Sequence, residues 1–99
     1  MLNVEKKLEN GTLTVAIEGR LDTITSPDLE AQINESIEGV KELVLDFAKV
    51  EYISSSGLRV LLAEQKTMNK QGTMKVINVN DTIMEIFEVT GFTDILTIE

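Results

Sequence analysis

The chain has 99 residues, and we expect one domain of a size that buries a single core without disulfides. It contains no cysteine and no histidine, which excludes disulfides, thiolate or histidine metal sites, and Ser-His catalysis. Its formal net charge of −8 disfavours nucleic-acid binding and suits a basic protein partner. No segment resembles a signal peptide or a membrane span, so we expect a soluble, cytoplasmic protein that does not insert into membranes.

The first two predicted elements are strands joined by a tight turn. Apolar residues alternate with polar ones in both segments: Leu2, Val4, Leu8, Leu13, Val15 and Ile17. Between the segments, Asn10-Gly11 is a strong signal for a two-residue hairpin. We therefore expect an antiparallel pair with one apolar face, in which Gly19 ends the second strand and residues 20–22 form a loop.

A helix is predicted after this loop. Ser26 is a favourable N-cap, and Pro27, the only proline, suits the first helical position. The apolar residues that follow share one helical face: Leu29, Ile33, Ile37 and Val40. Gly39 marks the expected end of this helix.

The apolar run 43–47 predicts a central strand. A second helix follows over residues 55–71, and Gly72 supplies its C-terminal stop. The side chains that we expect this helix to bury are Leu58, Leu61, Leu62 and Met68. Residues 74–79 form the next predicted strand.

The last predicted helix begins after Asn80, which is a favourable cap, and Gly91 closes it. Residues 95–98 form either a final short strand or a docked tail. The order β-β-α-β-α-β-α predicts an α/β domain over residues 1–99, with a mixed sheet of four or five strands and crossover helices. The alternation in the first two strands indicates that one face of the sheet is lightly covered.

Functional loops of open α/β sheets gather at the carboxyl ends of the strands. Three loops qualify here: 19–26, 48–57 and 78–81. From the topology we expect the first two to lie close together. Their polar side chains are Asp22, Thr23, Thr25, Ser54, Ser55 and Ser56.

The run Ser54-Ser55-Ser56-Gly57 opens the second helix and has two possible uses. In the first, Ser54 or Ser55 caps the helix and stabilises it by roughly 1 kcal/mol, while Gly57 eases the entry of the chain. In the second, one serine carries a phosphate, whose charge of about −1.5 to −2 is stabilised by the free N–H groups of the helix. The run lacks the spacing and the lysine of a P-loop, which disfavours nucleotide hydrolysis.

Structural roles are available to the nearby charged residues. Asp22 can accept hydrogen bonds in its own loop, from the amide of Thr23 or Ile24. Asp46 marks the solvent-facing side or the end of its strand, because an unpaired buried carboxylate is costly. Arg59 is either solvated or paired with one of three groups: Glu51, Asp22 or a phosphoserine.

Three segments together carry a family resemblance. The run Gly19-Arg20-Leu21-Asp22 is similar to a Gly-x-Leu-Asp motif, and residues 43–58 (LVLDFAKVEYISSSGL) are similar to a strand followed by a serine motif. Residues 83–91 are similar to a late helix that ends at a glycine. With this spacing the chain resembles, over essentially its whole length, a STAS domain of the anti-sigma factor antagonist family.

The resemblance implies a switch that is not an enzyme and needs no cofactor. Unphosphorylated members of the family bind an anti-sigma factor that is also a serine kinase, and this frees the sigma factor. The kinase then phosphorylates one serine at the start of the second helix, and a metal-dependent serine phosphatase reverses the modification. Aligned on Gly57, that serine is Ser55, with Ser54 and Ser56 as alternative acceptors.

The resemblance also implies a partner-binding surface. Ser54 replaces the acid of the family pattern Asp-Ser-Ser/Thr-Gly, Ser56 matches its second hydroxyl, and Asp22 matches the family's loop acid. The implied partner-binding residues are Asp22, Thr23, Ser54, Ser56, Gly57 and Arg59. The alternative function is a constitutive STAS adaptor of a stress-signalling or lipid-transport complex, without a phosphoswitch.

Overall fold

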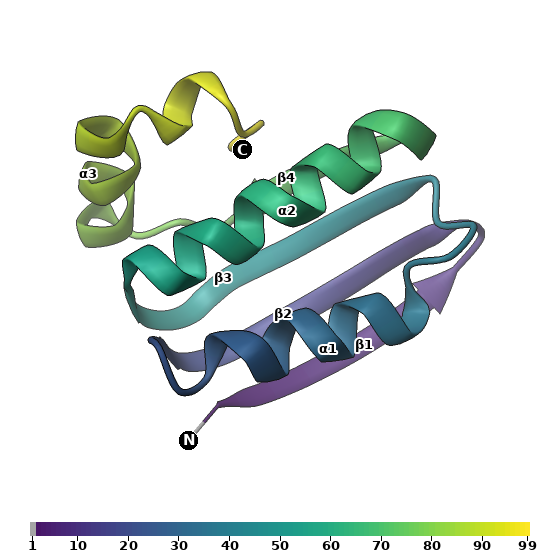
Figure 1. The fold of residues 1–99 in the computed structure, drawn as a ribbon, viewed down its shortest axis with the longest axis horizontal. Helices are drawn as coiled ribbons and strands as arrows, with labels where there is room; N and C mark the ends of the chain where they lie inside the picture. The colour runs from purple at the N-terminus through teal and green to yellow at the C-terminus, as the bar shows by residue number, and fades with distance from the viewer. Residues whose placement is uncertain (1) are drawn as a thin grey trace.

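Residues 2–99, which the computed structural model describes, fold into one four-stranded sheet with three α-helices (Figure 1). The strands lie side by side in chain order: β1 (Asn3–Glu9), β2 (Thr12–Leu21), β3 (Glu42–Ile53) and β4 (Thr73–Ile77). The helices are α1 (Ser26–Ser36), α2 (Ser55–Gln71), α3 (Asp81–Thr90) and a short 3-10 helix, η1 (Phe92–Asp94). This order confirms the predicted fold class.

The sheet is mixed, as predicted. β1 and β2 are antiparallel, whereas β2 and β3, and then β3 and β4, are parallel. The turn between β1 and β2 consists of Asn10 and Gly11, whose φ angles are 53° and 83°. Two-residue hairpin turns of this kind require positive φ at both central positions. Each parallel connection contains a helix, which is the usual form of a crossover between parallel strands.

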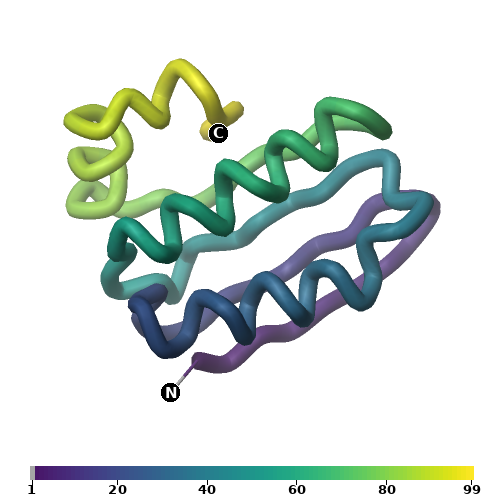
Figure 2. Tube along the Cα trace, in the orientation of Figure 1, coloured from purple at the N-terminus to yellow at the C-terminus, as the bar shows by residue number. Residues whose placement is uncertain are grey.

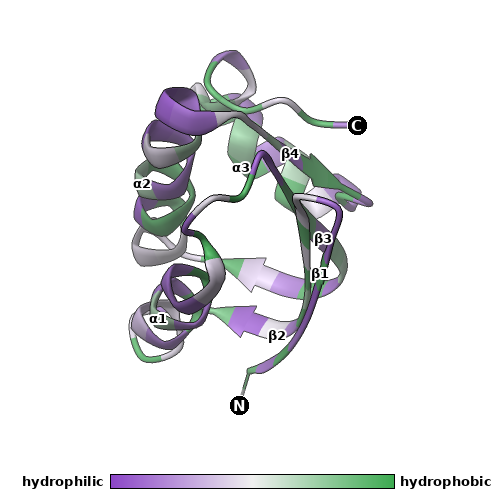
Figure 3. Cartoon of the chain, turned by 90° about the vertical axis from the view of Figure 1, so that its right-hand side faces the viewer, coloured by the Kyte–Doolittle hydropathy of each residue, from purple (hydrophilic) through white to green (hydrophobic). Residues whose placement is uncertain are grey.

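Helices α1 and α2 lie side by side over one face of the sheet (Figure 1). Figure 3, turned by 90°, shows both helices on the same side of the strands. The core residues of the two middle strands are almost completely buried: Leu13, Val15, Ile17, Leu43 and Leu45. Of their sequence neighbours on the opposite face, Val44 is buried at 7% exposure, and the others are only partly buried: Thr12, Thr14, Ala16 and Asp46. Asp46 therefore lies on the lightly covered face, where its Oδ1 accepts hydrogen bonds from Ala48 N–H and the Asn78 side chain, both at 3.0 Å.

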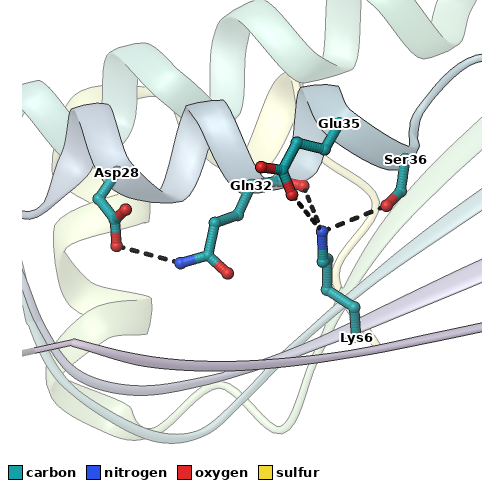
Figure 4. A network of polar contacts seen from close by, with 5 residues as sticks. All are labelled: Lys6, Asp28, Gln32, Glu35 and Ser36. Atoms are coloured by element: carbon teal, nitrogen blue, oxygen red, sulfur yellow. Dashed lines mark hydrogen bonds and ion pairs between the residues drawn. The ribbon is translucent and has the colours of Figure 1, made fainter.

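Lys6 connects β1 to the last turn of α1 (Figure 4). Its Nζ donates to the carbonyl oxygen of Gln32 at 2.9 Å, to Glu35 Oε1 at 3.0 Å and to Ser36 Oγ at 3.2 Å. A cation at this end of a helix meets free carbonyl groups and the negative end of the helix dipole. Lys6 therefore helps to hold α1 over the edge strand.

Both middle strands extend beyond their predicted ends. β2 continues past Gly19 to Leu21, and β3 continues past the predicted apolar run to Ile53. The prediction that Gly19 ends the second strand was therefore wrong. The pairs Arg20–Tyr52 and Leu21–Ile53 prolong the ladder, and two register shifts between β2 and β3 accommodate extra residues. Leu21 and Ile53 are buried, so the core holds both strand ends in place.

The N-cap position of α1 is Thr25, and the prediction that Ser26 is the N-cap was wrong by one residue. Ser26 lies in the first turn, where it is 1% exposed and its Oγ has no hydrogen-bond partner among residues 2–99. The hydroxyl of Thr25 donates to the Arg20 carbonyl at 2.6 Å instead of capping the helix. Pro27, predicted at the first helical position, is the second residue of the helix, because the N-cap lies one residue earlier than predicted.

Glycines stand after the first two helices for different reasons. α1 ends at Ser36, before the predicted end, and Gly39 instead lies in the following turn with φ of 79°. α2 has the predicted bounds, and the N–H of Gly72 donates to the carbonyl of Met68 at 2.6 Å. The backbone of Lys41 passes so close to Gly72 that a Cβ there would overlap its carbonyl group.

The apolar side of α2 packs largely as predicted. Leu58, Leu61 and Met68 are buried, but Leu62 is only partly buried. The exposed residues in the middle and at the end of this helix are polar: Arg59, Lys66, Asn69 and Lys70. No helix within residues 2–99 has both the length and the apolar composition that a membrane crossing requires.

Helix α3 is capped at both ends as predicted. The Oδ1 of Asn80 accepts the N–H of Ile83 at 2.8 Å, and Gly91 ends the helix with φ of 79°. Phe87 of α3 packs against Phe47 of β3, with ring centroids 6.2 Å apart. This aromatic pair joins the C-terminal part of the chain to the central strand.

The C-terminal segment returns to β4, as the trace in Figure 2 shows. The N–H of Val76 donates to the carbonyl of Thr97, and the N–H of Glu99 donates to the carbonyl of Val76, both at 2.9 Å. A single parallel bridge joins Val76 and Ile98. Of the two alternatives for residues 95–98, the docked tail is therefore correct.

Candidate functional site

The β2–α1 loop and the first turn of α2 lie against each other where β2 and β3 end. The N–H of Ser54 donates to the carbonyl of Leu21 at 2.8 Å. The hydroxyl of Ser56 donates to Oγ1 of Thr23 at 3.5 Å. The predicted proximity of these two segments is confirmed, and it places Asp22 and Thr23 next to the serine run.

The three serines have different surroundings. Ser54 is the N-cap residue of α2, but its side chain makes no capping bond, and its buried Oγ has no partner within the described residues. Ser56 is partly buried and contacts Thr23. Ser55, the first residue of α2, is exposed. Of the three hydroxyl groups, that of Ser55 is the most open to a modifying enzyme.

The first turn of α2 suits a negative charge. The helix has 17 residues and carries no acidic side chain in this turn. Its free N–H groups and the positive end of its dipole are therefore not neutralised from within the helix. An anionic group on Ser55 would gain roughly 0.3–1 kcal/mol at such a surface position.

Gly57 allows α2 to begin close to the strand ends. It is buried, and a Cβ at this position would lie 2.7 Å from Cγ1 of Ile53 and 3.0 Å from Cβ of Leu21. Only a residue without a side chain fits there unless a neighbour shifts. The position of Ser55 on the surface therefore depends on Gly57.

Arg59 is exposed on the second turn of α2. It forms no ion pair among residues 2–99, so the predicted pairing with Glu51 or Asp22 is not observed, and the solvated alternative applies. With Thr23 and Ser56, it lines a cleft of about 410 Å³ that also borders α1. Pairing of Arg59 with a phosphoserine stays a prediction.

Asp22 holds the β2–α1 loop in one conformation. Its Oδ1 accepts the N–H groups of Ile24 and Thr25, both at 3.0 Å, and the hydroxyl of Thr25 at 3.2 Å. The predicted bond to Ile24 is confirmed, whereas the second amide belongs to Thr25 and not to Thr23. The hydrogen bond from the Thr25 amide is the main cause that holds the pKa of Asp22 below its usual value. The other hydrogen bonds and the positive charge of Arg20 lower this pKa further. Asp22 is therefore ionised at neutral pH.

The family model of the STAS domain matches residues 3–99. The chain belongs to the STAS domain family. It is 32% identical over 100 aligned residues to the anti-sigma F factor antagonist of Paenibacillus polymyxa, with 98% of this chain and 86% of that protein covered. The predicted family is thereby confirmed.

The fold is similar to those of solved structures, among them an anti-sigma factor antagonist and SpoIIAA. The anti-sigma factor antagonist from Mycobacterium paratuberculosis has a TM-score of 0.89 and 23% identity, and the match covers 99% of this STAS domain and 85% of that chain. The phosphorylated form of SpoIIAA, a Bacillus cell fate determinant, has a TM-score of 0.75 and 19% identity. This match covers 100% of this STAS domain and 91% of the SpoIIAA chain. Within residues 2–99, this STAS domain has no group of acidic side chains arranged to hold a metal ion.

Sequence reasoning missed Glu64, a buried carboxyl group of this STAS domain. Glu64 lies on α2 and is 2% exposed, and its Oε1 has no hydrogen-bond partner among the residues described. Burial, and secondarily the charge of Glu30 on α1, raises its pKa to about 7. The signal was present in the sequence, because Glu64 stands between Leu61 and Met68 on the apolar side of the predicted helix.

The pair Arg20 and Tyr52 was also missed. The guanidinium of Arg20 lies over the Tyr52 ring, 4.5 Å from its centroid, next to the strand ends that carry the site. Such a cation–π contact at an exposed position contributes about 0.5–1 kcal/mol. No sequence signal could have found it, because the two residues meet only through the register of β2 and β3.

We expect Gly57→Ala to destabilise the STAS domain by about 1–3 kcal/mol, because the new methyl group overpacks Ile53 and Leu21. Urea unfolding of the two proteins measures this difference. Lys66→Ala, at an exposed position of the same helix, serves as the control and should change stability by less than about 0.5 kcal/mol. A similarly small effect of Gly57→Ala would contradict the tight packing described for this glycine.

Proposed function

We propose that this STAS domain is an anti-sigma factor antagonist that binds its anti-sigma factor when unphosphorylated and is released when Ser55 is phosphorylated. The exposure of Ser55 carries this proposal, because the Oγ of Ser54 is buried and that of Ser56 contacts Thr23. The name of the Paenibacillus relative and the existence of a phosphorylated form of SpoIIAA support it.

In this proposal the phosphate acts on the partner surface and leaves the fold intact. The N–H groups at the start of α2 accommodate the added charge of about −1.5 to −2 while the chain is free. A partner that covers this turn would desolvate the same phosphate. Desolvation of a charged group is unfavourable unless the partner supplies opposite charges or hydrogen bonds in place of the lost water. Phosphorylation therefore releases the partner while the domain stays folded.

No catalytic role is assigned to the chain itself. The anti-sigma factor acts as a serine kinase that transfers the terminal phosphoryl group of ATP to the Ser55 hydroxyl, and a serine phosphatase removes it by hydrolysis. The surface around Ser55 that the partner covers consists of Asp22, Thr23, Ser54, Ser56, Gly57 and Arg59. The chain is thus partner and substrate, and it needs no cofactor of its own.

The test uses the purified chain and the serine-kinase type of anti-sigma factor from the same genome. We expect a complex in size-exclusion chromatography without ATP, and dissociation after ATP and Mg²⁺ are added, with one phosphate located on Ser55 by mass spectrometry. A phosphate on Ser54 or Ser56 would overturn the assignment to Ser55. A complex that persists with no phosphate would instead favour a constitutive adaptor.

A further inference from the structure

Ile24 is the most exposed of the large apolar side chains within residues 2–99, at 87%. It lies in the β2–α1 loop, between the two residues that connect this loop to its surroundings. Thr23 contacts Ser56 on α2, and Thr25 binds the carbonyl of Arg20 on β2. Single exposed apolar side chains are common on protein surfaces, so the exposure of Ile24 gains meaning only from how its loop is held and from what this loop contacts.

The loop around Ile24 is fixed by hydrogen bonds on both sides. The N–H of Ile24 itself donates to Oδ1 of Asp22 at 3.0 Å, and the same oxygen accepts the N–H of Thr25. The N–H of Asp22 donates to the Thr25 hydroxyl at 3.0 Å, and the N–H of Ser26 donates to the Asp22 carbonyl at 2.9 Å. Binding through Ile24 would therefore require little further ordering of the backbone, which lowers the entropic cost of association.

The loop that carries Ile24 is in contact with the serine run. The loop is joined to the start of α2 by the bond from Ser54 N–H to the Leu21 carbonyl and by the contact between Thr23 and Ser56. The carboxylate that binds the Ile24 amide is that of Asp22, which stays ionised at neutral pH. An apolar side chain, a fixed negative charge and the exposed Ser55 are thus presented together.

We propose that Ile24 is the apolar anchor of the partner-binding surface and enters an apolar pocket of the anti-sigma factor, with a basic residue of that partner facing Asp22. This inference rests on the proposed function and names the chemistry of its partner. A few side chains that fill well-packed, desolvated pockets near the centre of an interface carry most of its binding energy. An apolar contact at the loop that touches the first turn of α2 also explains how a phosphate on Ser55 breaks the complex, because the partner would desolvate the added charge.

The test compares Ile24→Ala with Leu8→Ala in binding to the serine-kinase type of anti-sigma factor, measured by biolayer interferometry without ATP. Leu8 is 60% exposed and lies beside the hairpin turn, at the opposite end of β2 from the site. We expect Ile24→Ala to weaken binding about tenfold or more, mainly through faster dissociation, and Leu8→Ala to change it less than about twofold. Both variants should retain the wild-type urea midpoint, because neither removes a buried side chain.

The outcomes separate the two proposals. If the wild type binds the anti-sigma factor and Ile24→Ala binds it equally tightly, Ile24 is not an anchor, and the proposed function still stands. Equal weakening by both substitutions would also overturn the anchor, because the effect would not be specific to the loop. If the wild-type chain does not bind this partner, both the proposed function and the role of Ile24 as an anchor are wrong.

Discussion

Ser55→Asp is expected to weaken the complex with the anti-sigma factor by at least about tenfold, which corresponds to about 1.4 kcal/mol. The new carboxylate sits at the exposed start of α2, where the free protein tolerates it. In the complex it must be desolvated without a prepared partner, and this lowers the affinity. One carboxylate imitates a phosphate imperfectly, so the effect of phosphorylation itself should be larger. Isothermal titration calorimetry measures the affinity.

The matched variants are Ser55→Ala, Ser54→Ala and Ser56→Ala. We expect Ser55→Ala to bind as the wild type does and to remain bound after ATP is added, because it lacks the acceptor hydroxyl. The other two should still dissociate with ATP. If Ser55→Asp and Ser55→Ala both bind and release like the wild type, Ser55 is not the switch residue.

The stability of the domain is expected to fall as the pH rises from about 4.5 to about 7, because of Glu64. Its pKa is raised from the ordinary value of 4.5 to about 7. Between these values the folded protein holds a proton on Glu64 that the unfolded chain has lost, so rising pH favours unfolding. With about 1.4 kcal/mol per pKa unit, the loss amounts to about 3 kcal/mol by pH 8.

The pH dependence assigned to Glu64 can be tested by a single substitution, because few charged groups surround this residue. Glu30 is the charged group that faces it from α1, whereas the parts of β3 and β4 that enter the core contribute apolar side chains. Glu64→Gln removes the titration, so the difference in unfolding free energy between pH 5 and pH 8 should shrink by most of that amount. Glu85→Gln, at an exposed position of α3, is the control and should keep the wild-type pH dependence. Urea unfolding at the two pH values gives the result, and an unchanged pH dependence in Glu64→Gln would refute this role.

The helices that flank the site could be placed from short-range signals. The end of α2 before Gly72 and the caps of α3 at Asn80 and Gly91 were predicted correctly, because capping depends on residues within one turn of each helix end. The Asn10–Gly11 turn was predicted for the same reason, since two adjacent positive φ angles favour these two residue types. The motifs around Asp22 and the serine run likewise identified the family.

Contacts between distant segments decided the rest. The ends of β2 and β3 were misplaced, because the pairs Arg20–Tyr52 and Leu21–Ile53 join residues far apart in sequence. The N-cap of α1 was misplaced by one residue, because the hydroxyl of Thr25 binds β2 and Ser26 is buried inside the fold.

The sequence by itself determined the α/β class, the order of the elements, the family and the position of the serine run at the start of a helix. These follow from periodicity, caps and turns, which are local. Only the tertiary structure decided that Ser55 is exposed while the Oγ of Ser54 is buried, and that Ile24 is exposed on a hydrogen-bonded loop. Burial is a property of the packed chain, because it depends on which distant segments cover a residue.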